Sequence, residues 1–158
     1  MKLLKLKSWL RFGNSKKLYI AGDYFSDGKF LVHKKYFEEC NMNKTELKQN
    51  LKLNNDVEEI PDWQRFITEE KNLRSLLVTN ECVSCYNDFN GYSRYLINGD
   101  EKLKILVYDD YIMGLAEVFK SNYSISLIYK GIEKEKPVHV YYAKNNELVA
   151  VLMPVRFI

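Results

Sequence analysis

The chain has 158 residues, of which 46% are hydrophobic and 28% charged, a composition that suits one ordinary globular domain. This excludes a wholly disordered chain, and no apolar run approaches the roughly 20 residues that a transmembrane helix needs. The net charge is only +3, and only five of the 24 basic residues are arginine. Both facts argue against sequence-specific DNA recognition, because base edges and phosphates are read mainly by arginine.

The first residues are ambiguous between helix and strand. The apolar residues of segment 3–12 fit both a helical stripe and an alternating strand pattern. Lys2, Lys5 and Lys7 interrupt the apolar core that a signal peptide needs, so we expect a cytoplasmic protein. Three cysteines, an odd number in an intracellular chain, favour free thiols over a disulfide framework.

A β-hairpin and a capped helix are predicted next. Residues 18–25 and 29–36 favour two strands, joined by a turn at residues 26–28 that contains a glycine. Asn43 is placed to cap a helix over residues 44–53, because its side chain can accept a hydrogen bond from the first helical turn.

The polar middle of the chain then gives way to strands. Pro61 suits the first turn of a helix that carries Trp63, Phe66 and Ile67 on one face and fades near residue 72. Beyond it, the Asn98-Gly99-Asp100 turn is the strongest hairpin signal in the chain. The predicted strands cover residues 75–79, 82–86, 92–97 and 102–108.

The last third follows the order β-α-β-β-β. Asp109 or Asp110 can cap a helix over residues 111–122, which follows a strand over residues 103–108. Three strands come after the helix and should form an antiparallel meander with the helix on one face. They cover residues 124–129, 137–142 and 148–157.

These patterns predict an α+β fold with antiparallel sheets and helices packed on one face. No internal sequence repeat or linker divides the chain, so we expect a single domain over residues 1–158. Its second half covers residues 101–158. Its first half covers residues 1–100, and no pattern places the middle, residues 38–100, within it.

The C-terminal unit resembles a known family. Its ending, Leu152-Met153-Pro154-Val155-Arg156-Phe157, is similar to the last strand of the bacterial DNA sliding clamp, the β subunit of the replicative polymerase. Residues 111–119 resemble the clamp's helix, and residues 26–30 resemble one of its hairpins. The resemblance implies a clamp-like domain of two β-α-β-β-β halves around a shared core.

The resemblance also implies a function. In the clamp family the last strand lines a hydrophobic pocket that captures short peptides, and an adaptable methionine and a proline suited to an edge strand fit that use. We therefore predict a non-catalytic protein-interaction module with an unidentified protein partner. The resemblance suggests a phage or mobile-element protein, linked to DNA replication or to interference with host DNA processes. The predicted peptide-binding residues are Val151, Met153, Pro154, Val155, Arg156 and Phe157.

Nucleic-acid binding is the alternative, and it uses the other end of the chain. Trp9 and Phe12 are interleaved with basic residues there, a combination that can stack on bases and contact phosphates. The helix over residues 111–122 is acidic at its start, so we do not expect it to face DNA as a clamp helix does. The basic residues are Lys2, Lys5, Lys7, Arg11, Lys16 and Lys17. A monomer and a homo-oligomer are both left open.

Catalytic and metal sites receive less support. Cys82 and Cys85 form a Cys-x-x-Cys motif, but residues three apart on a strand point to opposite faces and cannot easily share a metal. His33 and His139 are read as histidines on strand surfaces rather than general bases. We predict neither an enzyme nor a bound metal or cofactor. A patch of solvated acidic residues is expected at Glu58, Glu59, Asp62, Glu69 and Glu70.

Overall fold

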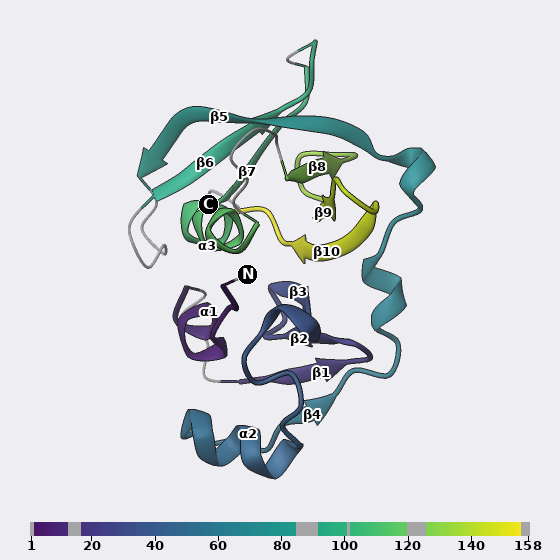
Figure 1. Cartoon of the computed structure of the whole chain (residues 1–158). Helices are drawn as coiled ribbons and strands as arrows, with labels where there is room; N and C mark the ends of the chain where they lie inside the picture. The colour runs from purple at the N-terminus through teal and green to yellow at the C-terminus, as the bar shows by residue number, and fades with distance from the viewer. Residues whose placement is uncertain (1, 13–16, 85–91, 101, 120–125, 156–158) are drawn as a thin grey trace.

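One mixed but mainly antiparallel sheet runs through the molecule and curls around its core (Figure 1). The computed structural model describes residues 2–12, 17–84, 92–100, 102–119 and 126–155. Over these residues ten strands form the sheet in the order β4-β1-β2-β3-β10-β9-β8-β5-β6-β7. The predicted α+β class is confirmed.

The first half of the chain contains a short helix followed by three strands. The helix is α1 (Leu6–Phe12), and the strands are β1 (Tyr19–Ala21), β2 (Tyr24–Ser26) and β3 (Phe30–His33). Prediction had placed a single strand over residues 18–25, but the chain turns at Gly22, whose φ is +60°. Glycine adopts that left-handed conformation without a Cβ penalty, so the run divides into β1 and β2.

The second half repeats this order of elements. It contains β7 (Lys104–Tyr108), α3 (Asp109–Val118), β8 (Leu127–Gly131), β9 (Val138–Tyr142) and β10 (Glu147–Leu152). The predicted β-α-β-β-β order and its antiparallel meander are confirmed. Neither predicted aspartate caps α3, because its N-cap is Tyr108 and the Asp109 carboxylate accepts a 2.6 Å hydrogen bond from Arg94.

Each half closes in the same way. Leu4, before α1, forms a parallel bridge with Phe37, and the Leu4 carbonyl accepts a hydrogen bond from the Glu38 N–H at 2.9 Å. In the second half the Leu106 carbonyl on β7 accepts one from the Val155 N–H at 2.7 Å. The segment before each helix therefore contacts the segment after the last strand of the same half. The structure therefore contains a repeat of this arrangement, although the sequence has no internal repeat.

The two halves meet at an antiparallel pair of equivalent strands. Leu31 on β3 lies opposite Val151 on β10, and the neighbouring pairs are Phe30 with Leu152 and Val32 with Ala150. This register relates the halves by an approximate twofold axis between the two strands. The helices α1 and α3 lie side by side (Figure 1) and share one apolar core with both halves.

The elements between the halves are a helix, a minimal strand and a long hairpin. The helix α2 (Lys44–Leu51) begins as predicted, with Asn43 and Glu46 forming a reciprocal capping box. It is followed by β4 (Glu58–Glu59), β5 (Arg74–Ser84) and β6 (Tyr92–Ile97). Two strands were predicted around Asn80 and Glu81, but β5 is continuous and absorbs the irregularity as a register shift between Val78 and Cys82.

The helix predicted after Pro61 is replaced by two short 3₁₀ turns. They are η2 (Trp63–Phe66) and η3 (Glu70–Asn72), and a further 3₁₀ turn, η1 (Lys34–Tyr36), follows β3. We call residues 60–73 the strap, because they pass from β4 to β5 along one side of the molecule (Figure 1).

Candidate functional site

The candidate site lies at the end of β10, in the centre of the sheet. β10 pairs with β3 on one side and β9 on the other, so it is not an edge strand, and Pro154 lies beyond its end. The strand ends at Leu152 because Pro154 has no N–H with which to continue the ladder. Just beyond the strand, the Met153 N–H donates to the carbonyl of Lys29, the residue before β3, at 2.9 Å.

The two faces of β10 serve different clusters. Ala150 and Leu152 point into the main core shared with α1 and α3. Val151 points to the opposite face, since successive side chains of a strand alternate. There it forms a second, smaller cluster with Ala21, Tyr24 and Leu31.

The strap covers this second cluster. Trp63 packs against Tyr24, with ring centroids 5.3 Å apart, and Phe66 and Ile67 pack beside it. The Ile60 N–H donates to the Ile20 carbonyl at 2.9 Å and anchors the start of the strap to β1. The outer face of the central strands is thus buried by a segment of the same chain.

A small apolar pocket remains open where the strap meets the end of β10. Its volume is about 40 Å³, enough for a small apolar group and far below that of a cofactor site. The walls come from three sources: β10 and its extension, the β2–β3 turn, and the strap. The lining residues are Ser26, Gly28, Lys29, Phe30, Leu31, Ile60, Phe66, Val151 and Met153. We call this the Met153 pocket.

The β2–β3 turn gives the pocket a fixed edge. The Ser26 hydroxyl accepts from the Gly28 N–H at 3.0 Å, and the Asp27 Oδ1 accepts from the Lys29 N–H at 2.7 Å. Gly28 has a φ of +95°, which is open to glycine and strained for other residues. Burial raises the pKa of the Asp27 carboxyl, whose Oδ2 is buried without a hydrogen-bond partner.

The six predicted peptide-binding residues do not all line this pocket. Val151 and Met153 do, whereas Pro154 is buried and the Val155 N–H donates to β7. Arg156 and Phe157 lie outside the described residues. The sequence reading missed Ile60 and Phe66. Phe66 was assigned to the apolar face of a helix, and Ile60 was given no role. No local sequence pattern shows which face of the sheet this segment covers.

The predicted nucleic-acid surface is only partly assembled. Lys2, Lys5 and Lys7 are exposed. Trp9, however, is 1% exposed and packed in the core, so it cannot stack on a base, and that part of the prediction was wrong. Lys17 is half-buried beside Tyr19. Lys16 and the side chains of Arg11 and Phe12 lie outside what the structure describes.

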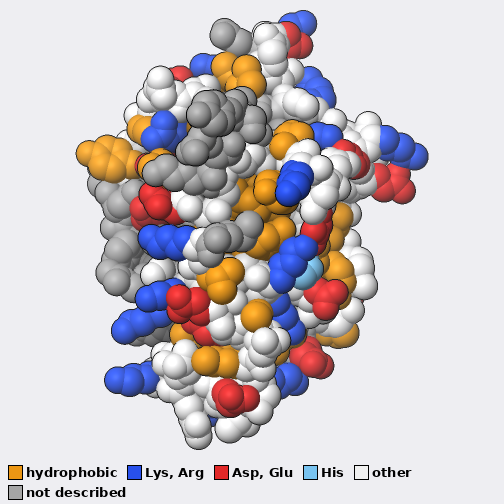
Figure 2. Space-filling view, viewed as in Figure 1, with side chains coloured by type: hydrophobic (Ala, Val, Ile, Leu, Met, Phe, Trp, Pro, Cys, Tyr) orange, Lys and Arg blue, Asp and Glu red, His pale blue; other side chains and the backbone are white. Residues whose placement is uncertain are grey.

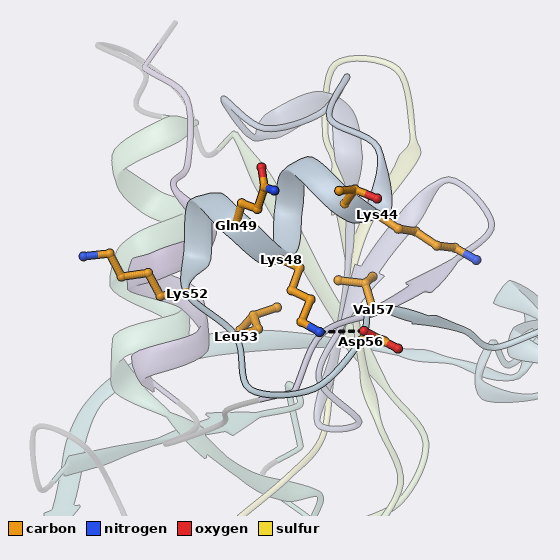
Figure 3. Close-up of a pocket in the computed structure, with 8 residues that line it drawn as sticks. Lys44, Lys48, Gln49, Lys52, Leu53, Asp56 and Val57 are labelled. Atoms are coloured by element: carbon orange, nitrogen blue, oxygen red, sulfur yellow. Dashed lines mark hydrogen bonds and ion pairs between the residues drawn. The ribbon is translucent and has the colours of Figure 1, made fainter.

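A broader basic hollow occurs on α2 (Figure 3). Lys44, Lys48 and Lys52 recur every four residues along one wall of a hollow of about 760 Å³. Lys48 turns toward Asp56 and donates to it at 2.7 Å, while Lys52 extends away. Lys44 pairs with Glu59 at 3.5 Å. Two of the three lysines therefore already hold carboxylates, and the hollow offers little net charge to an anion.

The predicted acidic patch is neutralised in the same manner. Asp62 pairs with Arg65 at 2.8 Å, and Glu70 pairs with Lys130 at 2.6 Å. On the face shown in Figure 2, basic and acidic side chains are interspersed rather than separated. Charge alone therefore marks no site on this face.

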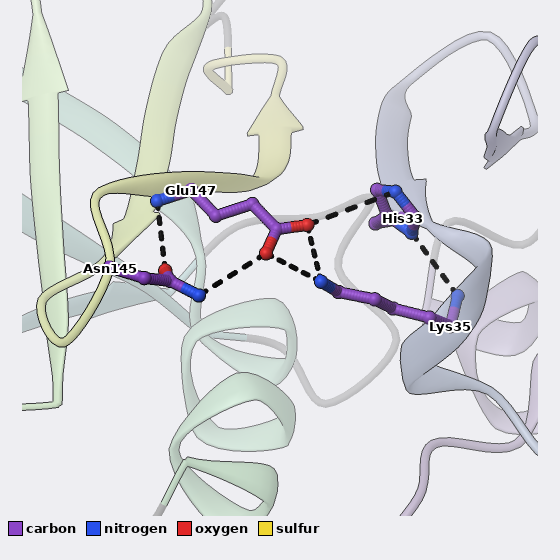
Figure 4. A network of polar contacts seen from close by, with 4 residues as sticks. All are labelled: His33, Lys35, Asn145 and Glu147. Atoms are coloured by element: carbon purple, nitrogen blue, oxygen red, sulfur yellow. Dashed lines mark hydrogen bonds and ion pairs between the residues drawn. The ribbon is translucent and has the colours of Figure 1, made fainter.

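A polar network joins the two halves at the end of the β3–β10 pair opposite the Met153 pocket (Figure 4). Lys35 pairs with Glu147 at the start of β10, and the Glu147 N–H donates to the Asn145 Oδ1 at 3.0 Å. His33 Nδ1 accepts from the Lys35 N–H at 3.2 Å. Burial and the Lys35 charge lower the pKa of His33. The network joins β3 to β10.

The second histidine is not on a surface. His139 is fully buried on β9, contrary to the prediction, and its Nε2 accepts a hydrogen bond from the Thr68 N–H of the strap at 3.0 Å. Burial lowers the pKa of His139. Cys82 is an exposed free thiol, and Cys85 lies outside the described residues. Within the described ranges, no three or more His, Cys, Asp or Glu residues are grouped as metal ligands.

Comparison with known proteins adds no further assignment. No family model matches the chain. Searches of curated proteins and of solved structures likewise return no match. In the described part of the chain, no helix has both the length and the apolar character needed to cross a bilayer.

Proposed function

We propose that this chain is a non-catalytic protein-interaction module that binds a peptide segment of a protein partner in the Met153 pocket. The observation that carries the proposal is the pocket itself, which brings Val151 and Met153 together with apolar residues of β3 and the strap. These are two of the residues for which the resemblance to the sliding clamp implies peptide capture. An apolar pocket with an adaptable methionine can bury one anchor side chain.

The architecture supports the same proposal. The clamp resemblance implies two β-α-β-β-β halves around a shared core. The second half has that order, and the first half has an isolated bridge at Leu4 followed by a helix and three strands around the same core. The helix α3 begins with Asp109 and Asp110, so it does not offer the basic surface that encircling DNA requires. We therefore place the function in protein contact linked to DNA replication or to interference with host DNA processes, and not in holding DNA.

The rim of the pocket defines the chemistry of the peptide. Lys29 contributes a cationic side chain to the lining, and the Arg65 guanidinium lies over the Phe66 ring, 4.7 Å from its centroid. Asp62 offsets part of the Arg65 charge. We expect the pocket to prefer a peptide with one small apolar residue beside an acidic residue, because the acidic residue complements the cationic rim.

A random-peptide display selection tests the proposal directly. We expect enriched peptides to share an apolar residue flanked by an acidic one, and to lose binding to Met153→Glu, which places a charge in an apolar pocket. The matched control is Met113→Glu, a methionine 51% exposed on α3 that is outside the pocket lining. Selected peptides that bind Met153→Glu as well as they bind the unaltered protein would contradict the proposal.

A further inference from the structure

The strap is fastened to the sheet by contacts at both of its ends. At the first end, Trp63 packs over Gly22, where a Cβ atom would lie 2.7 Å from the indole ring. At the second, Glu70 accepts from the Lys130 ammonium at 2.6 Å and lies within 3.4 Å of the Asn146 amide. Between them, the Thr68 N–H donates to His139 Nε2. The Lys130–Glu70 pair is partly exposed, and exposed pairs of this kind contribute little stability.

The strap also forms part of the Met153 pocket. Ile60 and Phe66 supply its outer wall, and both are only partly buried against the cluster around Val151. Displacing the strap would widen the pocket and uncover Val151, Leu31 and Tyr24. An apolar face of that extent is a surface on which a longer peptide could dock.

We infer that the strap is a removable cover over the peptide-binding face, and that His139 is its pH-sensitive latch. The inference rests on the proposed function, since it concerns access to the same pocket. In the closed state the strap occupies the face that a longer peptide would use. A peptide and the strap therefore compete for that face.

The latch depends on the protonation state of one imidazole. To accept from Thr68, Nε2 must lack a proton, which places the single proton of the neutral ring on Nδ1. Protonation would make both nitrogens donors, so the hydrogen bond to the strap would be lost. The Thr68 N–H and the imidazolium N–H would then oppose each other in a fully buried site.

The titratable groups around His139 do not change charge in the pH range in which a histidine titrates. On β8, Lys130 lies opposite His139. The Lys130 ammonium pairs with Glu70 and lies over the Tyr141 ring of β9. On β10, the residue opposite His139 is the uncharged Val151. Lys130 lowers the pKa of Glu70, and burial raises the pKa of Tyr141. Neither of these two groups changes charge in the range in which a histidine titrates.

The direction of the effect follows from linkage. Burial lowers the pKa of His139 in the closed state, and an open strap lets the ring return toward its ordinary pKa of about 6.5. The open state then binds more protons than the closed state below that pH. Strap closure therefore has its full stability above about pH 6.5. Below that pH, the closing equilibrium constant falls by up to about tenfold for each pH unit.

Hydrogen exchange measured peptide by peptide tests the latch on the full chain. Between about pH 7.5 and pH 5.5, across the histidine range, we expect strap amides to lose protection after correction for intrinsic exchange. Amides of α3 and β10 should keep theirs. His139→Gln retains a neutral acceptor that does not titrate, so it should abolish the pH dependence. Glu70→Gln should lower strap protection at every pH and retain the pH dependence.

The outcomes separate this inference from the proposed function, because the experiment contains no peptide. Unchanged strap protection across the range would overturn the latch, as would an equal loss in α3, which would mean global unfolding. If His139→Gln does not fold, the latch is still tested by comparing the pH dependence of amide protection in the strap and in α3, both in the unaltered protein and in Glu70→Gln. If the strap opens at low pH but display selection enriches no peptide, the inference of a pH-sensitive cover stands and the proposed peptide ligand is contradicted.

Discussion

The indole ring of Trp9 stacks on the phenol ring of Tyr111, with centroids 5.1 Å apart and planes inclined by 24°. Trp9 belongs to α1 and Tyr111 to α3, the helices that hold equivalent places in the two halves of the chain. Trp9 also meets Phe30 and Phe37 edge-on. This aromatic cluster joins the halves on the inner side of the sheet, as the β3–β10 pair joins them within it.

Removing the indole should therefore destabilise both halves together. Trp9→Ala is expected to lower the free energy of unfolding by about 3–5 kcal/mol, because it leaves a large cavity in a closed core. Urea denaturation followed by circular dichroism measures this. Lys7→Ala, at an exposed position of the same helix, should change stability by no more than about 0.5 kcal/mol. Equal effects of the two variants would contradict the role given to Trp9.

The turn at Gly22 supports the strap as well as the hairpin. Gly22→Ala forces a Cβ into the Trp63 ring at a positive φ, so it should displace Trp63 and shift its fluorescence to longer wavelength. Gly28→Ala is the matched control, since Gly28 also has a positive φ but its Cβ would meet no atom within 4 Å. Both should lose about 1–3 kcal/mol from backbone strain. Only Gly22→Ala should alter the Trp63 emission, and an unaltered spectrum would refute the contact.

The Arg94–Asp109 pair should contribute more to stability than the ion pairs on the surface. Its side chains are 17% and 14% exposed, and the Arg94 guanidinium also donates to the Thr79 carbonyl at 2.8 Å. Asp109→Ala is expected to cost about 1.5–3 kcal/mol, since a charged hydrogen bond is lost in a partly buried site. Asp62→Ala, which breaks the exposed pair with Arg65, should cost less than about 1 kcal/mol. Thermal unfolding of both variants gives the comparison.

Asp27 should make the fold less stable as the pH rises, whereas His139 should make strap closure less stable as the pH falls. Burial raises its pKa in the folded state, so the fold disfavours the ionised carboxylate and loses stability as the pH rises through that pKa. Asp27→Asn keeps an acceptor for the Lys29 N–H and carries no charge. It should be more stable than the unaltered protein at neutral pH, and the difference should vanish in acid. A constant difference at all pH values would exclude this explanation.

The sequence was informative where a local pattern is sufficient to specify structure. The capping box of Asn43 and Glu46 marks the start of α2 because both partners lie within one turn. The order of β7, α3, β8, β9 and β10 could be predicted because each element has its own periodicity and lies between turn residues. The Asn98 turn was also correctly placed, although its loop is longer than expected and β7 begins at Lys104.

Prediction from the sequence failed where long-range packing determines the local structure. The strap carries apolar residues at helical spacing, yet they form 3₁₀ turns because Trp63 packs at Gly22 and Thr68 binds His139, some 41 and 71 residues away in the chain. The burial of His139 depends on the same contact with the strap. The burial of Trp9 depends on other distant partners, such as Phe30 and Tyr111. Val151 and Met153 were identified through a family resemblance, whereas the other wall of their pocket was not, because nothing local links Phe66 to β10.

Methyl-group NMR of the methionines tests the central claim most directly. The chain has four methionines, so its labelled spectrum is simple. Of the three that the structure describes, only Met153 lines the pocket. On titration with a peptide enriched by display selection, the account predicts a saturable shift of the Met153 methyl signal and none of the Met113 signal. A Met153 signal that stays in place while the peptide binds would contradict it.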